Sequence, residues 1–155
     1  MSTKKYIHVG ELYIGIKPTE VCTILGSCVA VCLYDRLEKI GGMNHYLIPL
    51  WNGNGLQSPK YGNIAIHRLI EGMVNIGCRI ENLEAKIFGG GNVVDALSQE
   101  SMIVGRKNIV VAQEVLNEYG IPVTARDVGG VFGRRIMLQS QSGKVLLNYI
   151  HEEKR

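Results

Sequence analysis

The chain has 155 residues, of which 46% are hydrophobic and 20% are charged, and its formal net charge is +3. This length is typical of one folded domain, and we expect a single domain over residues 1–155. The small, dispersed positive charge disfavours a nucleic-acid-binding protein, and no apolar run is long enough to span a membrane. The N-terminus lacks a signal-peptide core, and four cysteines in so large a hydrophobic chain indicate a reduced, cytoplasmic protein.

Short β-branched runs bounded by glycine, proline or polar turns predict strands along most of the chain. The first segment, residues 6–16, predicts one bent strand or two short ones, and the later strands are expected at 20–25, 29–34, 40–48, 83–88, 121–128, 135–139 and 144–150. Apolar residues at helical spacing predict two helices, at 63–76 and 106–119. This order favours an α+β fold of mixed β-sheet layers flanked by two main helices.

A candidate nucleophile lies where the second of these later strands begins. Cys28 follows Gly26-Ser27, and His45 lies seventeen residues further on. The thiolate is the reactive form of cysteine, so a catalytic cysteine needs a neighbouring base near neutral pH. The alternative is that Cys28 is a small buried hydrophobe, the interpretation we favour for Cys32 and Cys78.

The spacing of the two strands suggests how Cys28 and His45 meet. We expect a four-residue hairpin loop over residues 35–38, which pairs Tyr34 with Lys39 and places Cys28 directly opposite His45. Directly opposed residues share a face of the sheet, whereas a slip of one residue would separate them.

Three other segments admit a structural and a functional interpretation. The glycines at 89–91 form either a turn close to the site or an anion cradle, and residues 127–135 form either a strand-end turn or a substrate-positioning loop. Trp51 is either a packing anchor or a substrate contact. No nucleotide-binding motif is present, the cysteine spacing does not fit a zinc site, and we expect no cofactor and no metal.

Five blocks, in order and spacing, give the chain its resemblance to a known family. They are residues 25–35, 42–49, 85–90, 104–108 and 127–135, within a match over about residues 8 to 148. Together these blocks resemble the CheD family of chemoreceptor glutamine deamidases of bacterial chemotaxis.

The resemblance implies a cysteine hydrolase fold like that of the cytotoxic necrotizing factor toxins. It implies deamidation of receptor glutamines to glutamate with release of ammonia, with Cys28 as nucleophile and His45 as base. The family's orienting threonine would fall at Cys22, so we expect the neighbouring Thr23, or a backbone carbonyl, to orient the imidazole. We expect oxyanion donors among the backbone amides of the Ser27-Cys28 turn.

The expected substrate is the cytoplasmic helices of methyl-accepting chemoreceptors, and a CheC phosphatase is a further partner that the resemblance implies. Two rival functions stay open at this point. One is a non-catalytic signalling adaptor that binds a phosphatase or a receptor, and the other is hydrolysis of receptor glutamate methyl esters, which differs only in the leaving group.

Overall fold

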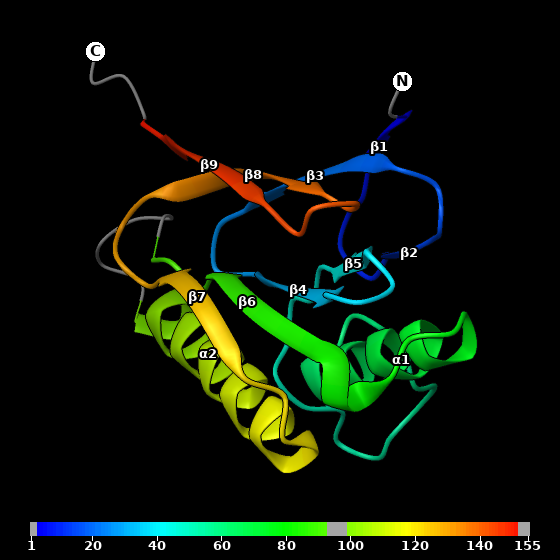
Figure 1. The fold of residues 1–155 in the computed structure, drawn as a ribbon. Helices are drawn as coiled ribbons and strands as arrows, with labels where there is room; N and C mark the ends of the chain where they lie inside the picture. The colour runs from blue at the N-terminus through cyan, green and yellow to red at the C-terminus, as the bar shows by residue number, and fades with distance from the viewer. Residues whose placement is uncertain (1–2, 93–98, 152–155) are drawn as a thin grey trace.

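The computed structural model describes residues 3–92 and 99–151. Three layers are stacked in Figure 1, with two helices at the bottom, a five-stranded sheet in the middle and a four-stranded sheet at the top. The helices are α1 (Gly62–Asn75) and α2 (Gln99–Tyr119), and a short 3-10 turn, η1 (Ile80–Asn82), precedes β6. Neither helix combines the length and the apolar character that crossing a bilayer requires.

Both sheets are mixed. The four-stranded sheet has the order β1 (Thr3–Tyr6), β3 (Thr19–Leu25), β8 (Gly133–Gln139) and β9 (Val145–Ile150). The five-stranded sheet has the order β2 (Leu12–Ile14), β5 (Ile40–Asn44), β4 (Val29–Asp35), β6 (Leu83–Gly89) and β7 (Val123–Val128). The pairs β1–β3 and β6–β7 are parallel, and the other paired strands are antiparallel. The α+β prediction of mixed sheets with two main helices is therefore confirmed.

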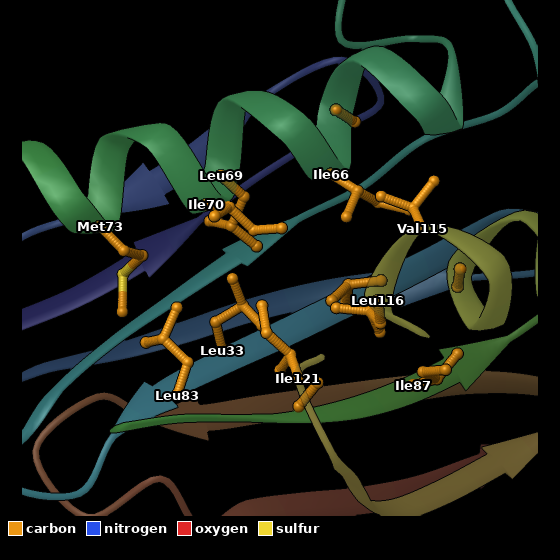
Figure 2. Packing of buried hydrophobic residues seen from close by; sticks show 14 of the residues in the cluster. Leu33, Ile66, Leu69, Ile70, Met73, Leu83, Ile87, Val115, Leu116 and Ile121 are labelled. Atoms are coloured by element: carbon orange, nitrogen blue, oxygen red, sulfur yellow. The ribbon is translucent and has the colours of Figure 1, made fainter. Parts of the chain in front are cut away.

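The middle sheet is buried on both faces, which gives β4 its continuous apolar sequence. Alternate residues of β4, such as Val31 and Leu33, pack against the helices, as Figure 2 shows for Leu33 with Leu69 and Leu116 nearby. The intervening residues Ala30 and Cys32 pack against the four-stranded sheet instead. Cys28 has the same parity as these two residues and also packs in the core between the sheets.

The predicted hairpin register is wrong by two residues. Tyr34 pairs with Gly41 and Asp35 with Ile40, so the loop covers residues 36–39. The physical reason is Asp35, which stays in β4 and accepts hydrogen bonds from the backbone N–H groups of Leu37 and Glu38, each at 2.9 Å. A shift of two residues preserves the alternation of faces, so His45 still faces the same side as Cys28.

Three predicted elements have other limits. The strand expected over 40–48 ends at Asn44. The segment 6–16 contains one complete strand, β2, because β1 already ends at Tyr6, and these two strands belong to different sheets. Helix α2 begins at Gln99, seven residues before the predicted start. Gly105 lies inside this helix because the helix passes close to Gly90, whose carbonyl oxygen would be only 2.5 Å from a side-chain carbon at position 105.

The connection from β3 to β4 carries the chain from one sheet to the other, and it is held by the end of β6. The Gly90 N–H donates to the Cys28 carbonyl at 2.8 Å, and the Gly91 N–H donates to the Gly26 carbonyl at 2.9 Å. Gly89, with φ of 107°, lies so close to this connection that a side-chain carbon there would collide with the Cys28 carbonyl oxygen. The triple glycine is therefore a turn that supports Cys28.

We expect Gly89→Ala to lower the free energy of unfolding by about 2–4 kcal/mol, because it adds a steric clash to the cost of a left-handed backbone. Gly120→Ala is the matched control, since Gly120 has φ of 71° and open space around it, and we expect a loss of about 1–2 kcal/mol there. Urea denaturation of the two variants measures the difference. Equal losses would show that Gly89 is not in close contact with the Cys28 segment.

Candidate active site

Cys28 lies in the turn that links the two sheets, immediately before β4. Its side chain is half-buried, and the three carbonyls at positions 26 to 28 all accept hydrogen bonds from other parts of the chain. The bond to the Ser27 carbonyl comes from the side chain of Asn108 in α2, at 3.0 Å. Hydrogen bonds to its three carbonyl oxygens thus hold the turn in place and orient the peptide units around Cys28.

His45 lies just beyond β5 and is buried in the core between the sheets. Its Nδ1 lies 2.7 Å from the Oγ1 of Thr23, which belongs to β3 in the other sheet. Cys22, the position where the family pattern would place the orienting threonine, is adjacent to Thr23 in the strand and therefore faces the opposite side of the sheet. The hydroxyl next to the imidazole is therefore that of Thr23.

The hydrogen bonds of Thr23 determine which nitrogen of His45 carries the proton. Thr23 Oγ1 lies 2.7 Å from the carbonyl oxygen of Ile7, which has no proton, so the hydroxyl must donate its proton to Ile7. Thr23 Oγ1 can then only accept a hydrogen bond from His45, and Nδ1 carries the proton. Nε2 is left as the acceptor of the neutral ring, and it is buried without a hydrogen-bond partner among the described residues.

Burial keeps both candidate catalytic groups neutral. Desolvation lowers the pKa of His45 to about 4, with a further decrease from the charge of His8. Desolvation also raises the pKa of the Cys28 thiol to about 11, although the backbone amide of Cys28 itself opposes this increase. At neutral pH the two groups are therefore an uncharged thiol and an uncharged imidazole.

The two groups face the same core but are not directly opposed. The bridge between Val29 and Tyr46 places His45 across from position 30, diagonal to Cys28. The thiol and Nε2 are not joined by a hydrogen bond. Catalytic hydrogen bonds are often long or unformed in sites without substrate.

The other segments considered for function make contacts within their own parts of the fold. Arg134 is buried and donates to Asp127 at 2.8 Å and to the Gly129 carbonyl at 2.8 Å, so it builds the loop after β7. Cys32 and Cys78 are buried, as predicted. Trp51 is half-buried, and its indole N–H donates to the Asn54 carbonyl at 3.1 Å within its own loop.

A surface depression of about 380 Å³ lies beside His45. Its walls are mostly apolar, and its lining residues are Tyr6, Ile7, His8, Val9, Thr23, Ile24 and His45. Tyr6 and Ile24 are more than half exposed, at 59% and 54%. Exposed apolar side chains next to a buried imidazole are typical of a surface that another molecule covers.

We expect the alkylation of Cys28 by iodoacetamide to become steadily faster as the pH rises toward 11. Only the thiolate reacts, and with a thiol pKa near 11 the rate at pH 8 should be at least about tenfold lower than that of a small free thiol. Peptide mass spectrometry after timed labelling follows this one cysteine, and Cys28→Ser is the control for labelling elsewhere. A rate plateau between pH 5 and pH 8 would instead reveal a thiolate–imidazolium pair.

Comparison with known proteins gives the family. A sequence model described as "CheD chemotactic sensory transduction" matches residues 49–149, a segment that begins after His45. A protein of Sulfurimonas denitrificans, named "Probable chemoreceptor glutamine deamidase CheD", is 52% identical over 149 residues, which cover 96% of each chain. Proteins with the same name from Trichlorobacter lovleyi and Methanococcus vannielii are 46% and 38% identical, over 93% and 96% of this chain and 89% and 96% of their own. The chain therefore belongs to the CheD family.

Proposed function

We propose that this protein is a chemoreceptor glutamine deamidase of bacterial chemotaxis, working in the cytoplasm, with Cys28 as nucleophile, His45 as base and Thr23 as the residue that orients the base. The relatives' name supports the reaction, and one observation supports the residues. This observation is the hydrogen bond between Thr23 and Nδ1, which leaves the Nε2 lone pair buried and free to accept a proton. The layered α+β arrangement is compatible with a cysteine hydrolase fold like that of the cytotoxic necrotizing factors, which we propose as its fold type.

The reaction begins from the neutral pair. Nε2 of His45 takes the thiol proton as the sulfur of Cys28 attacks the carbon of the glutamine carboxamide, which forms a C–S bond and a negatively charged oxygen. The carbonyls of the Ser27-Cys28 turn accept hydrogen bonds from other residues, and these bonds fix the orientation of its peptide units. The N–H groups of the same peptide units stabilise the negatively charged oxygen.

The second half of the reaction uses the same two groups. Nε2–H gives its proton to the amide nitrogen, the C–N bond breaks, and ammonia leaves a thioester on Cys28. Water then attacks the thioester while Nε2 takes a proton from it, and the C–S bond breaks. The sulfur recovers its proton, and the receptor side chain is released as glutamate.

Thr23 acts on the base and does not touch the substrate in this scheme. Thr23 accepts a hydrogen bond from the Nδ1–H of His45, which keeps the ring in the tautomer with a free Nε2. Its own hydrogen bond to the Ile7 carbonyl prevents the hydroxyl from turning away. Thr23 is therefore a positioning residue.

We propose that the receptor segment next to the target glutamine covers the depression beside His45. A segment with apolar side chains on either side of the glutamine fits its mostly apolar walls. A second partner, a phosphatase of the CheC kind, rests on the family resemblance alone.

We expect Cys28→Ala to abolish the deamidation of a chemoreceptor cytoplasmic fragment while the protein stays folded, because the change removes the sulfur and little volume. Mass spectrometry measures the reaction as a gain of about one dalton per glutamine, and Cys32→Ala is the matched control that should keep activity. A folded Cys28→Ala protein that still deamidates would refute the proposed nucleophile.

The same variants separate the rival functions. An adaptor would bind the receptor fragment without changing its mass, in the wild type as well as in the variant. A methyl-ester hydrolase would release methanol from a methylated fragment and leave the glutamines intact. Either result would contradict the deamidase proposal.

We expect Ile24→Glu to raise KM for the receptor fragment roughly tenfold and to leave kcat nearly unchanged, because it places a charge where apolar surface is covered on binding. Leu37→Glu is the control, since Leu37 is 73% exposed at the far end of the β4–β5 hairpin. Steady-state kinetics with the intact fragment give both constants. Equal KM values for the two variants would show that the substrate does not use the depression.

A further inference from the structure

We propose that Asn108 is a positioning residue that joins the Cys28 segment to the His45 segment and so sets the distance between thiol and base. The proposal rests on the roles given above to Cys28 and His45. Asn108 lies in α2, outside both segments, and it is completely buried.

The side-chain amide of Asn108 makes one hydrogen bond to each segment. Its Nδ2 donates to the Ser27 carbonyl at 3.0 Å, immediately before the nucleophile. It also donates to the Leu47 carbonyl at 3.0 Å, two residues after the base. The two hydrogens of one nitrogen atom therefore connect the two halves of the proposed catalytic pair.

Asn108 adds to the one backbone pair that joins these segments next to Cys28 and His45, in which Val29 and Tyr46 exchange hydrogen bonds of 3.1 and 2.9 Å. Nε2 of His45 has no hydrogen-bond partner among the described residues, and the backbone ladder is interrupted between the pairs Cys32–Met43 and Val29–Tyr46. In place of the Asn44 backbone, the Asn44 side chain accepts the hydrogen bond from the Val31 N–H at 2.8 Å. The separation of the thiol from the imidazole is therefore set by the surrounding supports.

Asn108 itself is held firmly. The Tyr46 hydroxyl donates to the Asn108 backbone carbonyl at 2.5 Å, and Tyr46 is fully buried. One helical turn earlier, Gly105 packs against Gly90 at the end of β6, in the same glycine turn that holds the Cys28 carbonyl. Helix α2 can approach the nucleophile turn this closely only because neither glycine has a side chain.

An asparagine suits this position for a chemical reason. A buried amide nitrogen offers two donors in one plane, which matches two carbonyl acceptors, whereas a carboxylate of the same shape offers none. Its Oδ1 is buried and unpartnered among the described residues, so the donors and not the acceptor are what the site uses.

The test compares Asn108→Ala and the isosteric Asn108→Asp with the wild type, using a receptor fragment that the wild-type protein deamidates. We expect both variants to lower kcat about 100-fold at pH 8 with KM changed less than threefold, because a displacement near 1 Å in a reacting pair costs about that factor. We also expect acidification from pH 8 to pH 5 to restore part of the Asn108→Asp rate, because the protonated acid regains one donor.

Two further variants act as controls. Asn63→Ala removes another helix asparagine that holds a loop, through the Trp51 N–H at 3.0 Å, and should leave kcat within twofold of wild type. Tyr46→Phe removes only the hydroxyl that holds Asn108 and should lower kcat severalfold, and it replaces the Asn108 variants if neither of them folds.

The activity of Cys28→Ala separates this proposal from that of the catalytic pair. If Cys28→Ala keeps activity, the catalytic pair is wrong whatever Asn108 does. If Cys28→Ala is inactive and folded Asn108→Ala keeps kcat within twofold, Asn108 is not a positioning residue. An unchanged kcat in Tyr46→Phe would overturn the proposal when the Asn108 variants do not fold.

Discussion

The hydrogen bond between Thr23 and His45 is the contact on which the rest of the site depends. It joins β3 of one sheet to the end of β5 in the other, across the core that both sheets bury. Because Thr23 donates to Ile7, the direction of the bond is fixed, and with it the position of the proton on the imidazole. The sandwich of two sheets therefore holds a buried histidine in one orientation, with the Nε2 lone pair free.

Burial has a second consequence, for stability. An imidazole that has a pKa near 6.5 in the unfolded chain has one of about 4 here, so the folded protein favours the neutral ring. This preference contributes stability that is complete above pH 6.5 and is lost as the pH falls toward 4. The proposed mechanism uses an uncharged His45, and the fold is most stable in the same pH range in which this ring is uncharged.

The sequence predicted most of the strands and both helices, because alternation and helical spacing are local signals. It also predicted that Cys28 and His45 share a face, since an error of two residues in the hairpin register leaves parity unchanged. The register itself was wrong because nothing in the spacing shows that the Asp35 side chain caps the loop from within β4. Asn108 was visible only as part of a family block, because its bonds to Ser27 and Leu47 join residues more than sixty positions away in the chain.

The state of the His45 ring is the most direct test of this account. Nitrogen NMR of the protein labelled with ¹⁵N-histidine reports which ring nitrogen carries the proton and the pH at which the second proton binds. We expect a neutral ring at pH 7, with the proton on Nδ1 and protonation of Nε2 only near pH 4. An imidazolium at pH 7, or a neutral ring with its proton on Nε2, would contradict it.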